Sequence, residues 1–275
     1  MKLKYFLITG ISLMFIGGIL AGITYNAGAQ KSMAWENGPK LLDIAQETKK
    51  IDGVEQIMIH AEYQHVTIKR GLNFEVAMTY EKSERPQLTV KNKRLSIIAN
   101  SKPHRAMIDM DDADAELTIT IPKDIELSEL QIESSNSAIE MDELTSKKVV
   151  LNMYDGWATI NALTADSLVA DDKLGTFSLI GSNIQTMKAS ASDSRFYLTR
   201  LDPESSGTVD MQNSQLTFHE METGGYDIQL EGDSRIERSD EESTTSSFSQ
   251  GKKKIKVTGQ NNMVRITTDD EEFED

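Results

Sequence analysis

The sequence predicts an all-β fold: a single β-solenoid, similar to a β-helix, made of short repeated strands behind an N-terminal transmembrane helix. Three observations predict it. Apolar and polar residues alternate in short runs, which is typical of strands with one buried face. The same alternating pattern recurs along residues 130–237 at a nearly constant interval. A separate run of 21 uncharged residues lies near the N-terminus.

The repeat unit has two or three alternating apolar residues, a polar group of Ser, Asn, Asp or Gly, and a second alternating apolar pair. One residue of the second pair marks the period in each copy, and these residues are Ile139, Ile160, Phe177, Phe196, Leu216 and Ile236. Their spacings are 21, 17, 19, 20 and 20 residues. A period of about 20 residues with an internal period of two indicates coils of short strands that stack and share one core.

Residues 1–30 are predicted to form a cytoplasmic stub and a transmembrane anchor. The uncharged run covers residues 5–25, which as a helix at about 1.5 Å per residue spans a hydrocarbon core of roughly 30 Å. Lys2 and Lys4 precede the run and favour a cytoplasmic N-terminus, so the rest of the chain is expected outside the cell. A cleaved signal peptide is the alternative, because residues 27–29 (Ala-Gly-Ala) have the small-x-small form of a cleavage site.

Residues 31–53 are predicted to be a juxtamembrane linker with a short helix from Lys40 to Lys50. Apolar residues recur there at roughly helical spacing after Pro39, a residue type that is well placed near the start of a helix. Gly53 is expected to end this helix.

The solenoid itself is predicted over residues 54–268, because the period of the apolar residues changes to two at Val54. Two polar stretches without a core pattern, residues 101–115 and 239–250, are expected to be excursions from the stack. Residues 269–275 are expected to form an acidic tail.

Composition limits the classes of partner. The chain has 29 basic and 44 acidic residues and a net charge of −15, which argues against nucleic acid and anionic lipid as partners and allows cationic ligands. The chain has no cysteine, so disulfides, thiolate metal sites and catalytic thiols are excluded. An exported protein of this size without disulfides suits a bacterium better than the eukaryotic secretory path.

No catalytic, cofactor or metal site is predicted. The sequence has no nucleotide-binding loop, no GxSxG motif and no HExxH motif, and its four histidines are too scattered to form a zinc site. The candidate surface residues are Asp155, Asp171 and Asp172, which are interpreted as corner residues, and Trp157. The lone aromatic Trp157 follows a turn and is interpreted as packing in the core or cap, with a sugar or partner contact as the alternative. The alternative to a non-enzyme is a β-helical enzyme acting on polysaccharide, in which these three carboxylates would meet across neighbouring coils in a cleft.

A resemblance to a known family begins at the strand of residues 116–122. Its Leu-Thr-Ile-x-Ile-Pro sequence, a short link and Leu-x-Ile-x-Ser-x-Asn at residues 130–136 resemble the bacterial putative-adhesin family, over roughly residues 54–268. Family members often have glycine after the Ser-Asn group, where this chain has Ser137 and Ala138. The resemblance implies an extracytoplasmic β-solenoid behind a membrane anchor, supplies no catalytic residue, and links some relatives to cell-envelope stress systems.

The function expected from the sequence is therefore that of a non-enzymatic, membrane-anchored interaction module of the bacterial cell envelope, in adhesion or the envelope-stress response. Its expected partners are the membrane, through the N-terminal helix, and an envelope protein, a cationic peptide or a wall polymer. The expected location is the cell membrane, with a single span, a cytoplasmic N-terminus and an extracellular C-terminal domain.

Overall fold

The chain divides into two compact units in the computed structural model. The model describes residues 2–26, 33–35, 38–103, 106–108, 115–202, 204–220, 225–238, 241–245, 247–250 and 254–267. The first unit comprises residues 1–45, 81–83 and 103–113, and the second comprises residues 46–80, 84–102 and 114–275.

The first unit contains a long helix and a small antiparallel sheet. The helix is α1 (Lys2–Asn26), and the sheet consists of β2 (Pro39–Leu41), β1 (Met33–Trp35) and β9 (Ala106–Ile108), with β1 in the middle. Apolar side chains along α1, such as Leu13, Met14 and Phe15, are exposed. Over the part of the chain that the structure describes, no helix meets the length and apolar character that crossing a membrane requires. The expected cleavage site at residues 27–29 lies outside the described residues.

The helix expected from Lys40 to Lys50 is wrong. The structure has β2 and β3 (Ile44–Lys50) in this range, and β3 is the edge strand beside β6 (Glu75–Glu81). An edge strand is hydrogen-bonded on one side only and needs few buried side chains, so its sequence does not carry the period of two. Gly53 has a φ of 68° and forms part of a turn after β3.

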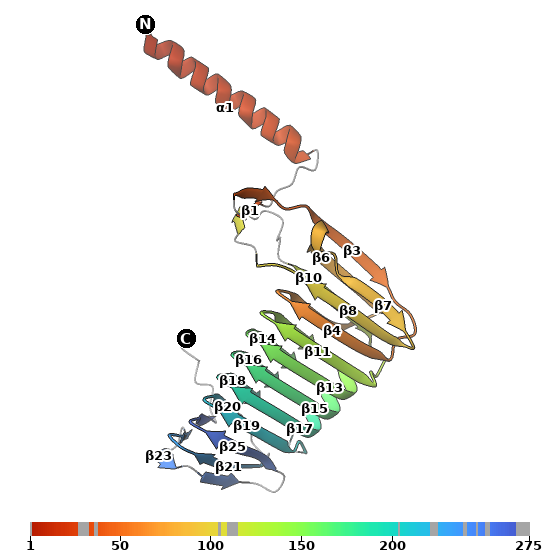
Figure 1. Ribbon diagram of the computed structural model, residues 1–275, viewed down its shortest axis with the longest axis vertical. Helices are drawn as coiled ribbons and strands as arrows, with labels where there is room; N and C mark the ends of the chain where they lie inside the picture. The colour runs from red at the N-terminus through yellow and green to blue at the C-terminus, as the bar shows by residue number, and fades with distance from the viewer. Residues whose placement is uncertain are drawn as a thin grey trace. The chain divides into compact units, whose positions relative to one another are not determined.

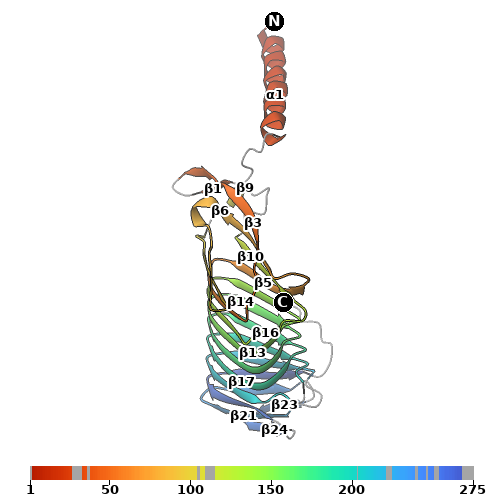
Figure 2. The ribbon, with the colours of Figure 1, turned by 90° about the vertical axis from the view of Figure 1, so that its right-hand side faces the viewer.

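The second unit is a stack of coils in which two sheets of mostly parallel strands face each other (Figures 1 and 2). The 11-stranded sheet has the order β24 (Ser247–Gln250), β21 (Gly225–Glu231), β25 (Lys254–Gln260), β19 (Gly207–Gln212), β17 (Asn183–Ser192), β15 (Thr164–Lys173), β13 (Thr145–Tyr154), β11 (Glu129–Ser135), β4 (Gln56–Glu62), β8 (Arg94–Asn100) and β7 (Gln87–Lys91), as far as the chain is described.

The 12-stranded sheet lies opposite, counted over the same described residues. Its order is β23 (Glu241–Thr245), β22 (Arg235–Arg238), β26 (Met263–Thr267), β20 (Gln215–His219), β18 (Arg195–Thr199), β16 (Thr176–Ile180), β14 (Trp157–Asn161), β12 (Ala138–Asp142), β5 (His65–Gly71), β10 (Glu116–Pro122), β6 and β3. A short 3₁₀ helix, η1 (Lys82–Glu84), follows β6. The prediction of an all-β fold of stacked, repeated strands is confirmed.

The core lies between the two sheets, and the period of two places alternate residues in it. In the coil of β15 and β16 the small Ala170 is buried in one strand and Phe177 in the other, and the next coil repeats this with Ala189 and Phe196. The two phenylalanine rings are in tilted contact, with their centroids 4.9 Å apart. Small residues on one sheet therefore make room for large ones on the other, and burial of each phenylalanine side chain contributes about 1.5–3 kcal/mol.

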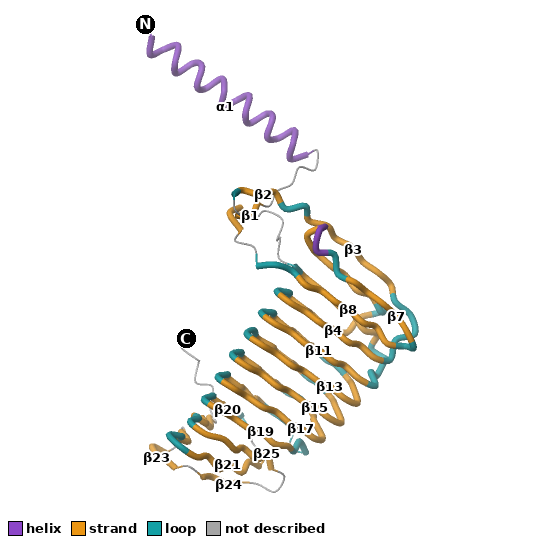
Figure 3. The backbone as a smooth tube through the Cα atoms, viewed as in Figure 1, coloured by secondary structure: helices purple, strands orange, loops and turns teal. Residues whose placement is uncertain are grey.

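The turns that lead from the 11-stranded to the 12-stranded sheet lie above one another along the stack (Figure 3). One residue in each of seven such turns has a φ between 50° and 62°, and these residues are Tyr63, Asn136, Asp155, Leu174, Asp193, Asn213 and Asn261. Asn and Asp tolerate this left-handed conformation, which explains why they recur at the corners.

A buried polar residue follows the left-handed residue in several of these corners, as in Ser194, Ser214 and Asn262. Each accepts a hydrogen bond from a main-chain N–H of the neighbouring coil: Gly175 N–H donates to Ser194 Oγ at 3.3 Å, and Ser194 N–H donates to Ser214 Oγ at 3.1 Å. The serine hydroxyls donate in turn to main-chain carbonyls, so these buried polar groups are satisfied.

Two coils lie out of sequence order. The last described coil, β25 and β26, lies between the coil of β19 and β20 and the coil of β21 and β22 (Figure 1). At the other end of the stack, the coil of β4 and β5 lies between β8 with β10 and β11 with β12. The last coil thus fills a place between two earlier coils, whereas the coil of β4 and β5 comes first in the chain and has later strands on both sides.

The polar stretch at 239–250 contains β23 and β24, which pair antiparallel with β22 and β21 at the end of the stack. The expected excursion from the solenoid is therefore part of both sheets, because an end strand needs main-chain pairing and little core pattern. The stretch at 101–115 contains β9. Residues 109–114 and the tail at 269–275 lie outside the described residues.

The insertion of the last coil is testable at Gly259. This residue has a φ of 143°, and a Cβ added to it would collide with the carbonyl oxygen of Met211 on β19. We expect Gly259→Ala to lower the free energy of unfolding by about 2–4 kcal/mol, from strain and overpacking together. Urea unfolding followed by circular dichroism measures the loss.

Gly181→Ala is the matched control. Gly181 has a φ of 56°, and nothing lies within 4 Å of the added Cβ. We expect this variant to lose about 1 kcal/mol, from backbone strain alone. Equal losses in the two variants would contradict the close approach of β25 to β19.

Candidate functional site

Asp155 and Trp157 lie at one corner of the stack. Asp155 is the exposed left-handed residue of its turn, and Trp157 begins β14 on the outer face of the 12-stranded sheet, with 40% of its surface exposed. The Trp157 ring contacts the His65 ring across the small Ala138, with centroids 6.0 Å apart. His65 Nε2 lies 3.4 Å from a carboxylate oxygen of Glu140. The indole is therefore accessible, but packed on one side.

Asp171 and Asp172 do not form a corner, which corrects the sequence interpretation. Strand β15 continues to Lys173, and the turn is made by Leu174 and Gly175. Because successive residues of a strand point to opposite faces, Asp171 faces outward and Asp172 faces the core. Gly156 and Gly175 are 19 residues apart, which is one repeat of the pattern. This spacing is the signal in the sequence that places the corner at Gly175.

Asp172 is buried in the core with 1% of its surface exposed. Its neighbours in the same inward column are Met153 on β13 and Ala191 on β17. Neither carboxylate oxygen has a hydrogen-bond partner among the described residues. Burial in this environment raises the pKa of Asp172 to about 6, and the negative charge of Asp171 adds to the rise.

The corner beside Asp172 explains how the carboxyl fits. Gly175 stands where the next two coils have Ser194 and Ser214, and a Cβ on Gly175 would collide with Asp172 Oδ1. The carboxyl therefore occupies the space that a serine side chain fills in the neighbouring coils. The Ser194 hydroxyl lies close enough to offset part of the pKa rise, but it donates to the main-chain carbonyls of Asp172 and Ser192.

The three predicted carboxylates do not share one face. Asp155 lies in a turn, Asp171 points out of the stack and Asp172 points into it. Within the described ranges, no group of three or more His, Cys, Asp or Glu side chains is placed to hold a metal ion. The arrangement provides no cleft in which these three groups meet.

Asp171 instead belongs to a long groove on the outer face of the 11-stranded sheet. One hollow of about 790 Å³ is lined by Asp171, Lys173, Ser190, Ala191, Ser192, Asp210, Met211, Gln212, Gln229, Leu230, Glu231, Thr258, Gly259 and Gln260. A second hollow of about 340 Å³ also has Asp171 and Lys173 in its lining, together with His60 and Tyr154. The two hollows therefore adjoin at β15, and the polar groove crosses the strands. We call it the outer groove.

The polar side chains of the outer groove form rows, because the strands are in register. One row is Asp171, Ser190, Asp210, Thr258 and Gln229, on five neighbouring strands. The row beside it is Lys173, Ser192, Gln212, Gln260 and Glu231. Sequence reasoning found Asp171 only. The period links Asp171 to Ser190 and Asp210, but it cannot place Thr258 or Gln229, which come from coils out of sequence order.

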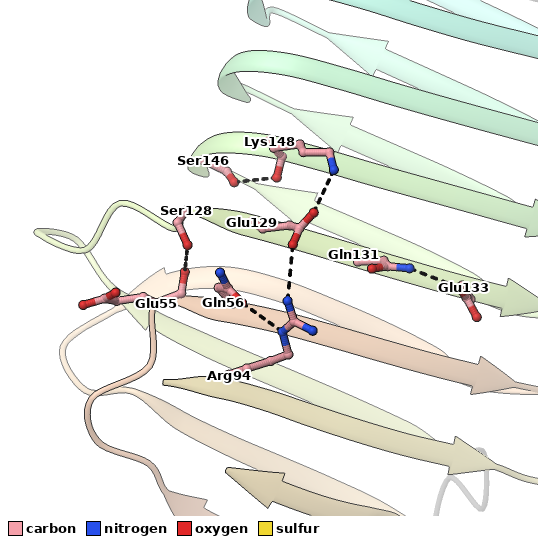
Figure 4. A network of polar contacts seen from close by, with 9 residues as sticks. All are labelled: Glu55, Gln56, Arg94, Ser128, Glu129, Gln131, Glu133, Ser146 and Lys148. Atoms are coloured by element: carbon pink, nitrogen blue, oxygen red, sulfur yellow. Dashed lines mark hydrogen bonds and ion pairs between the residues drawn. The ribbon is translucent and has the colours of Figure 1, made fainter. Parts of the chain in front are cut away.

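The other half of this sheet has paired charges, in contrast to the outer groove. Glu129 forms ion pairs with Lys148 at 2.9 Å and with Arg94 at 3.6 Å, and Arg94 also donates to Gln56 (Figure 4). This network joins four neighbouring strands. In the outer groove, the side chains of Asp171, Ser190, Gln212 and Gln229 have no polar partner among the described residues.

The buried Asp172 predicts a pH-dependent stability. The pKa of its carboxyl is raised on folding, so the folded chain retains a proton that the unfolded chain releases near pH 4. The contribution of Asp172 to stability is therefore most favourable below pH 4, falls as the pH rises to about 6, and then stays lower by at most roughly 3 kcal/mol. We expect Asp172→Ala to remove this fall and to be more stable than the parent at pH 8, as measured by urea unfolding from pH 4 to 8.

Asp171→Ala is the control for Asp172→Ala, since it removes the neighbouring outward carboxyl. It should keep most of the fall in stability between pH 4 and 6. A difference in stability between the parent and Asp172→Ala that stays constant from pH 4 to 8 would contradict the assignment.

Several solved structures are similar to the chain. A putative adhesin from Bacteroides fragilis is 13% identical, covers 82% of this chain and 97% of its own, and has a TM-score of 0.44. A putative adhesin from Parabacteroides distasonis has the same identity and coverage and a TM-score of 0.45. A putative lipid binding protein from the same species is 10% identical, covers 82% of this chain and 96% of its own, and has a TM-score of 0.38.

The search of sequences gives a more specific result. No curated protein matches the chain. The family model described as Toastrack DUF4097 matches residues 54–270, which cover the described strands of the two facing sheets apart from β3. The resemblance to the putative-adhesin family is thereby confirmed, and the chain belongs to the Toastrack DUF4097 family.

Proposed function

We propose that the chain is a non-enzymatic interaction module of the bacterial cell envelope and that it binds its ligand in the outer groove. The observation that carries this proposal is the two rows of outward polar side chains, in which Asp171, Ser190, Gln212 and Gln229 have no polar partner among the described residues. Unpaired donors and acceptors in a hollow provide contacts for a ligand without breaking bonds within the protein. A role in adhesion or in the envelope-stress response is consistent with such a module.

The membrane anchor is part of the same proposal. It is supported by the uncharged run at residues 5–25 and by the preceding Lys2 and Lys4. The exposed apolar side chains of α1 would be costly in water and favourable in lipid. The stack of coils would then lie outside the cell, tethered at its N-terminal end.

Catalysis on polysaccharide receives no support from the carboxyl groups. The carboxyl with the raised pKa, Asp172, faces the core, where a substrate does not reach it. A glycosidase requires an acid and a second carboxylate on either side of one bond. The arrangement of Asp155, Asp171 and Asp172 does not provide such a pair, so binding is the function that the geometry favours.

Binding in the outer groove is testable with a triple variant, Asp171→Ala, Gln212→Ala and Gln229→Ala, which we call the groove variant. Immobilised full-length chain is incubated with a protease-treated and an untreated envelope fraction of the source organism, and the retained material is quantified. We expect the groove variant to retain at least about tenfold less than the parent, because three sets of hydrogen bonds to the ligand are lost.

The double variant Thr159→Ala and Ser178→Ala is the matched control. Both residues face outward on the 12-stranded sheet, away from the outer groove. The control should retain as much material as the parent. Equal retention by the parent and the groove variant would contradict the proposed site.

The anchor is testable by extraction and protease protection. We expect the full-length chain to remain in the membrane during alkaline carbonate extraction, and protease added to intact cells to digest the stack while an N-terminal tag is protected. Deletion of residues 5–25 should release the chain from the membrane. A full-length chain that carbonate extracts, or a protected C-terminal domain, would contradict this location.

A further inference from the structure

We infer that the outer groove binds a straight, neutral, hydroxyl-rich polysaccharide chain that lies across the strands. The inference rests on the proposed function, since it names the ligand class of the same site. It follows from the chemistry of the lining, from the side chains that have no partner, and from the spacing of the rows.

The lining offers mainly uncharged groups that both donate and accept hydrogen bonds. These are the hydroxyls of Ser190, Ser192 and Thr258 and the amides of Gln212, Gln229 and Gln260. Sugar hydroxyls also donate and accept, so each can pair with a group of either kind. The charged lining residues are three carboxylates, Asp171, Asp210 and Glu231, and one cation, Lys173. Each carboxylate can accept hydrogen bonds from a pair of sugar hydroxyls. Lys173 offsets part of their negative charge.

Most of this hydrogen-bonding capacity is unused within the protein. Asp210 accepts one bond from Thr258 at 3.2 Å, and Glu231 accepts one from Gln260 at 3.3 Å. A carboxylate accepts about four, so both retain free positions. Asp171, Ser190, Gln212 and Gln229 have no polar partner among the described residues. A ligand in the groove therefore exchanges the hydrogen bonds of these side chains to water for bonds to its own groups, without breaking bonds within the protein.

The spacing of the rows matches an extended polymer. Neighbouring strands lie about 4.8 Å apart, so each row presents one polar side chain at about that interval over five strands. One sugar ring of an extended β-1,4-linked chain advances by a similar length, so successive rings meet equivalent groups. The two rows are two residues apart along each strand, or about 7 Å, and can hold the two edges of a ring.

An aromatic ring lies at one end of the groove. Tyr154 is exposed over 52% of its surface, and it belongs to the same row as Lys173 on the neighbouring strand. It lines the adjoining hollow together with His60. An exposed ring of this kind provides an apolar face for one sugar ring, while its hydroxyl stays in water.

Other occupants fit the outer groove less well. A peptide that adds as a strand needs a free sheet edge, but β15, β17, β19 and β25 are each paired on both sides. A lipid tail needs an apolar lining, but the apolar lining residues Ala191, Met211 and Leu230 point into the core and are buried. A polyanion is repelled by the net charge of −15 and by the three carboxylates of the lining. The charged groups of a polycation only donate hydrogen bonds, so they give the amide N–H groups of Gln212, Gln229 and Gln260 no acceptor.

Titration calorimetry of the full-length chain in detergent tests the inference. The probes are cello-oligosaccharides and chito-oligosaccharides of three and six rings, maltohexaose, oligolysine and polygalacturonate. We expect the extended hexamers to bind at least about tenfold more tightly than the trimers, and the groove variant to bind them at least about tenfold more weakly than the parent. The Thr159→Ala and Ser178→Ala control should bind as the parent does, and the coiled maltohexaose should bind more weakly than cellohexaose.

The inference is overturned if neither extended series binds, if trimers bind as tightly as hexamers, if the groove variant binds as the parent does, or if oligolysine or polygalacturonate alone binds. Groove-dependent retention of envelope material without glycan binding would overturn the ligand class and leave the proposed function standing. Loss of both would overturn both.

Discussion

The register between neighbouring coils is the constraint on which the rest of the structure depends. Each strand is hydrogen-bonded to the strand above and below, so equivalent residues lie in columns about 4.8 Å apart. Every inward residue must therefore fit between the equivalent residues of the two neighbouring coils, as Ala170 fits between Leu151 and Ala189. A residue whose side chain does not match its column must be accommodated by a change in the side chains of the adjacent corner or of the facing sheet.

The same columns produce both unusual features of the second unit. On the inner side, Asp172 interrupts an apolar column, and the missing side chain at Gly175 leaves the room that its carboxyl occupies. On the outer side, columns of polar residues become the rows of the outer groove. A single repeating geometry thus places one unpaired carboxyl where water does not reach it and several unpaired polar groups where a ligand does.

Much of the stack could be predicted from the sequence, because the apolar residues, Phe177 and Phe196 among them, recur with two periods. The period of two indicates strands, and the period of about 20 indicates stacked coils. β3 could not, since an edge strand needs no such pattern. The candidate site was predicted only at Asp171. Asp172 was given to a corner because its residue type suits turns, and the groove residues Thr258 and Gln229 depend on a coil order that no local pattern records.

The out-of-order last coil has a mechanical consequence. In a solenoid with sequential coils, tension on the C-terminus would peel the terminal strands from a sheet edge, one pair of hydrogen bonds at a time. Here the terminal strands β25 and β26 are held between two neighbours each, so pulling must shear both sides of an internal coil at once. The strands β25 and β26 therefore resist unzipping more than strands at a free sheet edge would.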